Sequence, residues 1–415
     1  MRATDGNVAV MVAFALLPML IMIGAAVDYS RDLRVQTALQ AAVDAAALNT
    51  ARQSPGLTSA QMLAIAQNSV AAGFSVSGVS DPTTTLTYTP VGTANATITV
   101  TARVSVPTTF MNLVGVRTND VAATSTSTWG STRLRVALAL DNTGSMKDFN
   151  KIGALRTATK NLLTSLQSAA GKDGDVYVSI IPFAKVVNVG TSNASSSWLS
   201  WSYFDANIKT CNIFGNNCTP LSRSRWDGSI TDRDKDSDLS NTTPTSGSTL
   251  FPASQASDSP VSMIGLTYDW AALNAKVETM KPNGATNQGI GLAWAWQSLT
   301  TGAPLNAPAK DANYKYSDVI IILSDGLNTA NRWDGNGRDP SPAVDTRQKS
   351  LCDNIKKAGV IIYAVQVNTD NADTAEALQY CASDASKFVK LTTADQIITT
   401  FQSIGASLSQ LRLSN

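Results

Sequence analysis

Three short polar segments, far apart in the chain, carry the side chains of a candidate metal site. They are residues 141–145, 284–286 and 324–326, with the sequences DNTGS, GAT and SDG. Their oxygen donors are the carboxylates of Asp141 and Asp325 and the hydroxyls of Thr143, Ser145 and Thr286. Such hard donors, with no imidazole or thiolate among them, suit Mg²⁺ or Mn²⁺ rather than zinc or copper. A lone D-x-T-x-S is more often a turn or a helix cap, so the prediction depends on all three segments together.

The elements around these segments predict that the first and third lie at one edge of a sheet. Residues 319–323, and residues 134–140 except for Arg135, are apolar and typical of buried strands, and a polar segment follows each run directly. From residue 133 onward strands and helices alternate, which predicts an α/β fold with a doubly wound parallel sheet. Ligand sites of such folds lie at the carboxyl ends of the strands. Helices are expected at 151–169, 269–280, 287–299, 346–357, 374–380 and 394–408, and further strands at 176–182 and 360–367.

A long insertion, residues 191–259, interrupts this alternation. It is rich in Ser, Asp, Gly and Pro, and a loop of this length inside a compact domain is usually functional or disordered. Four of its aspartates alternate with other residues as in a calcium loop: Asp232, Asp234, Asp236 and Asp238. Ser237 and Thr243 stand where an EF-hand has Gly and Glu, so a solvated acidic loop is favoured and Ca²⁺ at 232–238 is the alternative.

The composition narrows the classes of function. Of 415 residues only 15% are charged and the net charge is +1, so nothing indicates a nucleic-acid partner. The chain has no histidine, which excludes Ser-His-Asp and Cys-His catalysis and His-ligated zinc. A metal-dependent hydrolase that uses Asp141 and Asp325 is an alternative, but no obvious general base accompanies these residues. We therefore expect a protein that is not an enzyme.

Four cysteines match no zinc-binding spacing: Cys211, Cys218, Cys352 and Cys381. Three disulfide pairings are possible, and proximity in the sequence favours Cys211 with Cys218 and Cys352 with Cys381. Four buried thiols are the alternative, because disulfide formation depends on the compartment.

The N-terminal region begins with a candidate membrane helix. Residues 8–27 are twenty consecutive apolar or small residues, enough to span a bilayer core as a helix. A cleaved signal peptide is the rival interpretation, but the run continues without a turn into the helical pattern of residues 35–47. A helix near 59–72 and half-buried strands near 84–89, 96–106 and 120–128 then indicate a pilin-like α+β region. The expected domains are a membrane helix and stalk (1–53), the pilin-like region (54–130) and the α/β domain (131–415).

The three polar segments resemble the metal-ion-dependent adhesion site of von Willebrand factor type A domains. In that pattern D-x-S-x-S is followed by a distant threonine and a distant aspartate. Carried over position by position, the resemblance implies five metal ligands: Asp141, Thr143, Ser145, Thr286 and Asp325. Thr143 departs from the pattern but keeps a hydroxyl. The resemblance also implies a cation with one open coordination position, which a partner's carboxylate fills.

The chain is also similar to TadG-like proteins of the TadE/G group, which belong to the Flp (tight adherence) pilus assembly system. The similarity lies in GNVAV at 6–10, AVDY at 26–29 and LQAAVDAAA at 39–47, and it continues at 226–228, 232–234 and 408–413. Met11 stands where a prepilin cleavage site carries glutamate, which argues against processing by a prepilin peptidase.

These resemblances imply an envelope-anchored Flp/Tad pilus-assembly or adhesion protein that binds a partner through its metal. Pilus components or other pseudopilin-like subunits are the expected partners, and a purely structural pilus component is an alternative. The positive-inside rule favours an N-terminus outside, because Arg2 precedes the apolar run and Arg31 and Arg34 follow it. The family resemblance and the expected disulfides favour the opposite, and long domains cross membranes largely regardless of charge. We expect a single-pass protein of the bacterial inner membrane whose large C-terminal region lies outside the cytoplasm.

Overall fold

A computed structural model describes residues 6–54, 57–89, 96–129, 132–211, 216, 218–311, 314–369 and 373–413. The chain forms two compact units, Met1–Ser131 and Thr132–Ser414.

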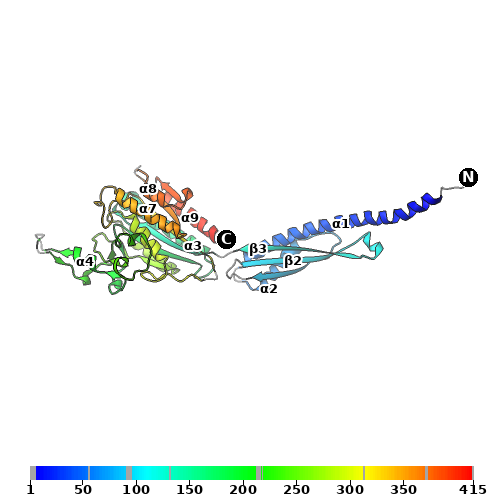
Figure 1. The fold of residues 1–415 in the computed structure, drawn as a ribbon, viewed down its shortest axis with the longest axis horizontal. Coiled ribbons are helices and arrows are strands. Elements are labelled where there is room, and N and C mark those ends of the chain that lie inside the picture. The colour runs from blue at the N-terminus through cyan, green and yellow to red at the C-terminus, as the bar shows by residue number, and fades with distance from the viewer. Residues whose placement is uncertain are drawn as a thin grey trace. The chain divides into compact units, whose positions relative to one another are not determined.

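The first unit packs two helices against a three-stranded antiparallel sheet (Figure 1). Helix α1 (Gly6–Gln53) continues through Pro18 without interruption. Helix α2 (Ser59–Gly73) begins at a capping box, in which Thr58 and Gln61 each accept a hydrogen bond from the other's backbone N–H. The strands lie in the order β1 (Thr83–Thr89), β2 (Ala96–Pro107) and β3 (Thr118–Trp129).

The alternation of threonine with apolar residues in β2 separates the two faces of this sheet. Apolar residues such as Ile98 and Val100 are buried against the helices. On the other face the hydroxyls of Thr99 and Thr101 lie 3.0 Å from those of Thr126 and Thr124 on β3. One face is therefore the core and the other a polar surface, as the period-two pattern predicts.

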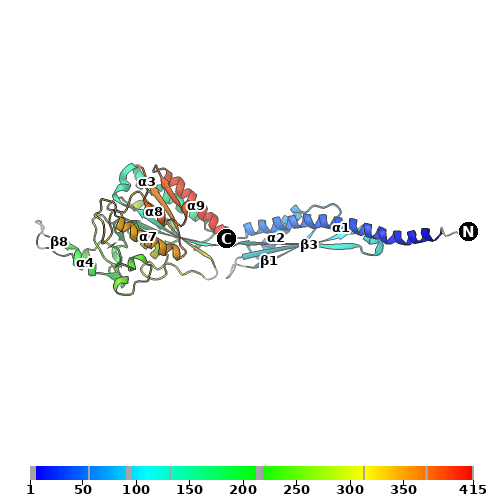
Figure 2. The ribbon, with the colours of Figure 1, turned by 45° about the horizontal axis from the view of Figure 1, so that its top comes forward.

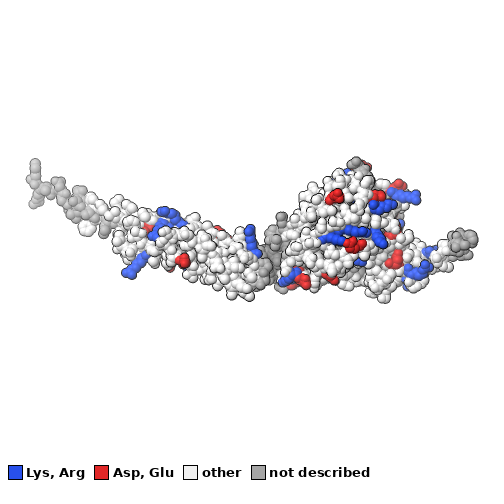
Figure 3. Space-filling model, turned by 180° about the vertical axis from the view of Figure 1, so that it is seen from behind, with Lys and Arg blue, Asp and Glu red and all other residues white. Residues whose placement is uncertain are grey.

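The burial of side chains on helix α1 changes along its length. From Val35 onward one side of the helix is buried against α2 and the sheet. Before that point most of its described apolar side chains are exposed. Residues 8–27 carry no charge, and Figure 3 shows no Lys, Arg, Asp or Glu on the part of this run that the structure describes. Within the described residues, the segment Phe14–Gln53 of α1 is the stretch whose length and apolar composition suffice to cross a membrane.

The second unit is mixed α/β, as predicted. Its central strands are parallel and lie in the order β5 (Val176–Phe183), β4 (Arg133–Asp141), β13 (Tyr316–Ser324), β14 (Ile361–Val367) and β15 (Phe388–Leu391). Short antiparallel strands that we did not predict extend the sheet beyond β5. They are β6 (Val187–Asn188), β10 (Ser229–Ile230) and β12 (Ile264–Thr267).

Helices cover both faces of this sheet and form two separate hydrophobic cores (Figure 2). On one face lie α3 (Lys151–Ala169), α5 (Trp270–Thr279) and α9 (Gln396–Leu413). On the other lie α6 (Gln288–Ser298), α7 (Pro342–Lys357) and α8 (Glu376–Cys381). Strands β4 and β13 are buried along most of their length because both of their faces are covered.

The described part of the insertion 191–259 is packed rather than loose. It contains β7 (Leu199–Ser200), α4 (Ser202–Asn207), β8 (Lys209–Thr210), β9 (Thr219–Pro220) and β11 (Phe251–Pro252). Phe251 packs on Trp294 of α6 with ring centroids 4.5 Å apart, and Trp198 contacts both rings edge-on. The tryptophans of the insertion therefore join it to the core above α6.

A candidate metal centre at the ends of two adjacent strands

Strands β4 and β13 bring the first and third polar segments together. The two strands pair in parallel with Leu140 opposite Leu323, so Asp141 and Ser324 lie side by side at their carboxyl ends. The Asp141 carboxylate accepts a hydrogen bond from Ser324 Oγ (2.5 Å) and another from the backbone N–H of Thr143 (2.7 Å). Asp141 is completely buried, so its carboxylate is held in one orientation.

Hydroxyl groups connect this aspartate to the second one. Asp325 Oδ1 accepts a hydrogen bond from Ser145 Oγ at 2.7 Å. Ser145 Oγ in turn lies 3.2 Å from Thr143 Oγ1. Four of the five predicted ligands thus form one cluster, and Ser145 is its exposed member, so the cluster opens to solvent there.

The middle segment is joined to the first by two backbone hydrogen bonds. Gly144 N donates to Gly284 O at 2.9 Å, and Asn283 N donates to Asn142 O at 2.7 Å. Gly284 has a φ of +89°, and a Cβ added there would lie 2.5 Å from a carboxylate oxygen of Asp258, so the position needs glycine. Thr286, the fifth predicted ligand, lies two residues further on and is buried; its backbone N–H donates to Thr329 Oγ1 at 3.0 Å.

A buried lysine, Lys151, belongs to the cluster and was missed from the sequence. Its ammonium donates to Asp325 Oδ2 at 2.7 Å, and both side chains are almost inaccessible to solvent. Lys151 is the first residue of α3, where the helix dipole disfavours a cation. A lysine at the first position of a predicted helix could have indicated that an acidic group elsewhere in the chain neutralises it.

The charges of the cluster suit a divalent cation. Burial raises the pKa of Asp141 to about 7, and the negative charge of Asp325 adds to this effect, while hydrogen bonds from Ser324 and Thr143 oppose it. The cluster contains one ammonium group, that of Lys151, and two carboxylates, those of Asp141 and Asp325. When both carboxylates are ionised, a net negative charge is therefore buried. Carboxylates, hydroxyls and an opening to solvent are what a hard cation such as Mg²⁺ or Mn²⁺ requires. No group of three or more His, Cys, Asp or Glu is gathered anywhere in the described residues, so a cation here depends on the hydroxyls.

The raised pKa predicts how acidity affects cation binding. A folded-state pKa above the unfolded value means that the apo protein loses stability as the pH rises from about 4 to about 7. A bound cation displaces the same proton, so the affinity for Mn²⁺ should be about tenfold weaker at pH 6 than at pH 8. Calorimetric titration in buffers of different ionisation enthalpy measures both the affinity and the proton released. Equal affinities at the two pH values, with no proton release, would contradict this assignment.

The aspartates of residues 232–238 have other partners. Asp232 accepts from Asn287 Nδ2 at 3.1 Å and from the backbone N–H of Arg332 at 3.0 Å, and burial raises its pKa to about 6. Asp234 pairs with Arg332 and Asp238 with Arg347. These contacts favour an ion-paired segment over a calcium loop. Because Asn287 follows Thr286 directly, Asp232 also ties the insertion to the middle segment of the candidate metal site.

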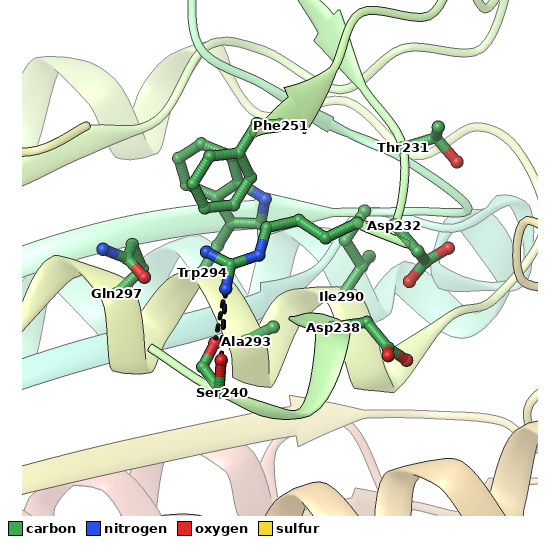
Figure 4. A pocket seen from close by; sticks show the side chains of 10 residues that line it. Thr231, Asp232, Asp238, Ser240, Phe251, Ile290, Ala293, Trp294 and Gln297 are labelled. Carbon is green, nitrogen blue, oxygen red and sulfur yellow. Dashed lines mark hydrogen bonds between the residues drawn. The ribbon is translucent and has the colours of Figure 1, made fainter. Parts of the chain in front are cut away.

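A small cavity lies beside this ion-paired segment (Figure 4). Phe251 and Trp294 line one side of it and Asp232 and Asp238 another, and its volume of about 20 Å³ holds about one water molecule. The cavity is therefore too small for an organic ligand.

Both disulfides join cysteines in the pairing that sequence proximity favoured. Cys211 is linked to Cys218 beside the short β8–β9 hairpin. Cys352 of α7 is linked to Cys381 at the end of α8, and both of these residues are fully buried.

Comparison with known protein families gives a match for the N-terminal segment. Residues 6–53 match the model of the family described as "Putative Flp pilus-assembly TadE/G-like". No curated protein matches the chain.

Among solved structures the chain is distantly similar to pilus proteins and to a protein of the mussel byssus. The pilus adhesin SpaC from Lactobacillus rhamnosus GG aligns over 82% of this chain and 36% of its own, with 13% identity and a TM-score of 0.41. The vWF domain of the type V pili tip protein Mfa5 from Porphyromonas gingivalis aligns over 67% of this chain and 95% of its own, with 10% identity and a TM-score of 0.38. Proximal thread matrix protein 1 from the mussel byssus, with a zinc occupied MIDAS motif, aligns over 67% and 46%, with 14% identity and a TM-score of 0.35.

The chain thus spans only about a third of the length of the pilus adhesin. The similarity to TadE/G-like Flp pilus-assembly proteins that the sequence predicted is confirmed for residues 6–53.

Proposed function

We propose that this protein is an envelope-anchored Flp/Tad pilus-assembly or adhesion protein that binds a protein partner through a divalent cation held by its second unit. The second unit would be a von Willebrand factor type A domain with a doubly wound sheet. The observation that carries the proposal is the cluster of Asp141, Thr143, Ser145 and Asp325 at the ends of β4 and β13. The segment that contains Thr286 is joined to this cluster by the hydrogen bond from Gly144 N to Gly284 O. The cation, Mg²⁺ or Mn²⁺, would supply an open coordination position for a carboxylate of the partner.

The residues of the chain have separate tasks in this proposal. The two aspartates supply the negative charge, and the hydroxyls of Thr143, Ser145 and Thr286 complete the donor set. Lys151 neutralises Asp325 when no cation is bound, because an unpaired buried carboxylate is costly. The exposed end of the cluster at Ser145 is where a partner can approach.

An exposed aromatic residue next to this opening favours a protein partner. Phe149 is 69% exposed and follows Ser145 by four residues, at a kink where the backbone is not helical. Phe149 and Asn150 both have positive φ, at 53° and 56°, which is strained for residues other than glycine. Such strain is often concentrated at functional sites, and aromatic residues are enriched at interface hot spots.

Hydrolysis by the same aspartates is the second candidate, and the site gives it less support. Asp141 is buried and engaged by Ser324 and Thr143, and Asp325 is engaged by Ser145 and Lys151. Neither carboxylate is left to activate a water molecule as a general base. We infer a binding role without catalysis.

Anchoring follows from α1. We propose that residues 8–27 span the inner membrane and that the second unit, with its two disulfides, lies outside the cytoplasm. The partners would be pilus components or pseudopilin-like subunits.

Photo-crosslinking at the opening of the site tests the proposal. p-Benzoylphenylalanine at position 149 should give an adduct with a pilus protein in cells that make the protein, because Phe149 is exposed and follows Ser145 by only four residues. The adduct should be lost in the variant Asp141→Asn and in permeabilised cells treated with a chelator. Tyr380, an exposed aromatic residue on α8, is the control position, and p-benzoylphenylalanine there should give no metal-dependent adduct. An adduct at 149 that survives both Asp141→Asn and chelation would show that partner binding does not need the cation.

A further inference from the structure

The loop between β2 and β3 presents apolar side chains to solvent at the end of the first unit that carries the apolar run of α1 (Figure 1). The loop, residues 108–117, contains the short helix η1 (Met111–Val114). Leu113 is 83% exposed and Phe110 44%, and Val114 and Val116 are exposed as well. A group of exposed apolar side chains marks a surface that contacts another protein or a membrane.

Hydrogen bonds hold this loop at a defined level along α1. The buried carboxylate of Asp28 accepts from the backbone N–H groups of Thr109 (2.9 Å), Phe110 (2.9 Å) and Met111 (2.8 Å). Arg31, one turn further along α1, donates to the carbonyl oxygen of Pro107 at 3.1 Å. Several charge-assisted bonds thus join the loop to the helix.

That level lies within the apolar run. A Cβ added to Gly24 would lie 2.5 Å from Cβ of Phe110, so the phenylalanine packs directly on the glycine. Gly24 precedes Val27, the last residue of the run, by three residues, which is about 4.5 Å along a helix axis. A bilayer that surrounds residues 8–27 therefore reaches the loop.

Two arginines, Arg31 and Arg34, follow the last residue of the apolar run by four and seven residues. An open groove of about 330 Å³ beside the loop is lined by residues that include Thr109, Arg31 and Arg34. Arginine at the boundary of a bilayer keeps its stem in apolar surroundings and its charge among the headgroups.

We propose that the β2–β3 loop is inserted into the membrane interface, with Phe110, Leu113 and Val114 among the lipids and Arg31 and Arg34 at the phosphates. The inference rests on the proposed anchoring of α1 in the membrane. It adds a second point of membrane contact, which sets the angle at which the first unit leaves the bilayer. A bilayer is favoured over a second protein because the loop lies at the same level as residues that must be in lipid.

Depth-dependent fluorescence quenching tests this placement on the full chain in nanodiscs. The four native cysteines are all in disulfides, so one introduced cysteine can be labelled alone with an environment-sensitive fluorophore. The three variants are Ile21→Cys in the apolar run, Leu113→Cys in the loop, and Leu48→Cys on α1, about 31 Å beyond Val27. Leu48 and Leu113 are both exposed, which makes them a matched pair.

Brominated lipids should quench the labels at Ile21 and Leu113 at least about fivefold more than the label at Leu48. Strong quenching at Ile21 with a label at Leu113 that only aqueous iodide quenches would overturn the insertion of the loop and leave the anchor standing. A label at Leu113 shielded from both quenchers would mean that a protein covers the loop, and would also overturn the proposal. A label at Ile21 that lipid does not quench would refute the anchoring itself.

Discussion

Replacing Asp325 with alanine should destabilise the metal-free second unit by about 3–5 kcal/mol and abolish Mn²⁺ binding. The stability effect arises because Lys151, buried at the first position of α3, loses the carboxylate that neutralises it. The binding effect arises because the cluster loses one of its two carboxylates. Urea denaturation in the presence of a chelator measures the first effect, and calorimetric titration of the folded variant measures the second.

Three further variants separate the two effects. The double variant Asp325→Ala/Lys151→Met should regain most of the lost stability, because both charges of the buried Lys151–Asp325 pair are removed. It should not regain metal binding, because the carboxylate of Asp325 is still missing. Lys151→Met alone should be destabilised in chelator and regain stability with Mn²⁺, because the cation can replace the ammonium. Asp384→Ala, which removes an exposed aspartate paired with Lys387, should change neither property. Unchanged Mn²⁺ affinity in both Asp325→Ala and Asp141→Ala would eliminate the metal site.

Removing the disulfide between Cys352 and Cys381 should cost about 3–4 kcal/mol of unfolding free energy. The link closes a loop with a sequence separation of 29 and joins α7 to α8 on either side of β14. Its loss leaves the unfolded chain with more conformations, and chain entropy rises with the length of the loop that was closed. The double variant Cys352→Ala/Cys381→Ala can be compared with reduced wild-type protein, which loses the bond but no atoms.

The second disulfide is the matched control. Cys211 and Cys218 are separated by 7 positions beside an exposed hairpin, so their double alanine variant should lose about 2.5 kcal/mol at most. Mass spectrometry of protein taken from the native envelope should show both linkages. Four free thiols there would place the second unit in a reducing compartment and contradict the proposed orientation.

Local pattern was sufficient to predict the elements that carry the site. The apolar runs before Asp141 and Asp325 are β4 and β13, and the helix expected at 151–169 is α3. Hydrophobic periodicity reflects which face of a segment is buried, so neighbouring residues alone reveal it. The antiparallel strands β6 and β10, with two residues each, were not predicted because they are too short to show a period.

The sequence by itself determined the donor types of the candidate site, the cysteine pairs favoured by proximity and the apolar run of α1. Only the tertiary structure decided that Lys151 neutralises Asp325, which lies 174 positions away, and that Asp232 ties the insertion to Asn287. It also decided that Asp28 holds the β2–β3 loop beside Gly24. These contacts join segments distant in sequence, and no local period records them. They exist because a charge or an N–H group buried by packing needs a partner wherever the fold can supply one.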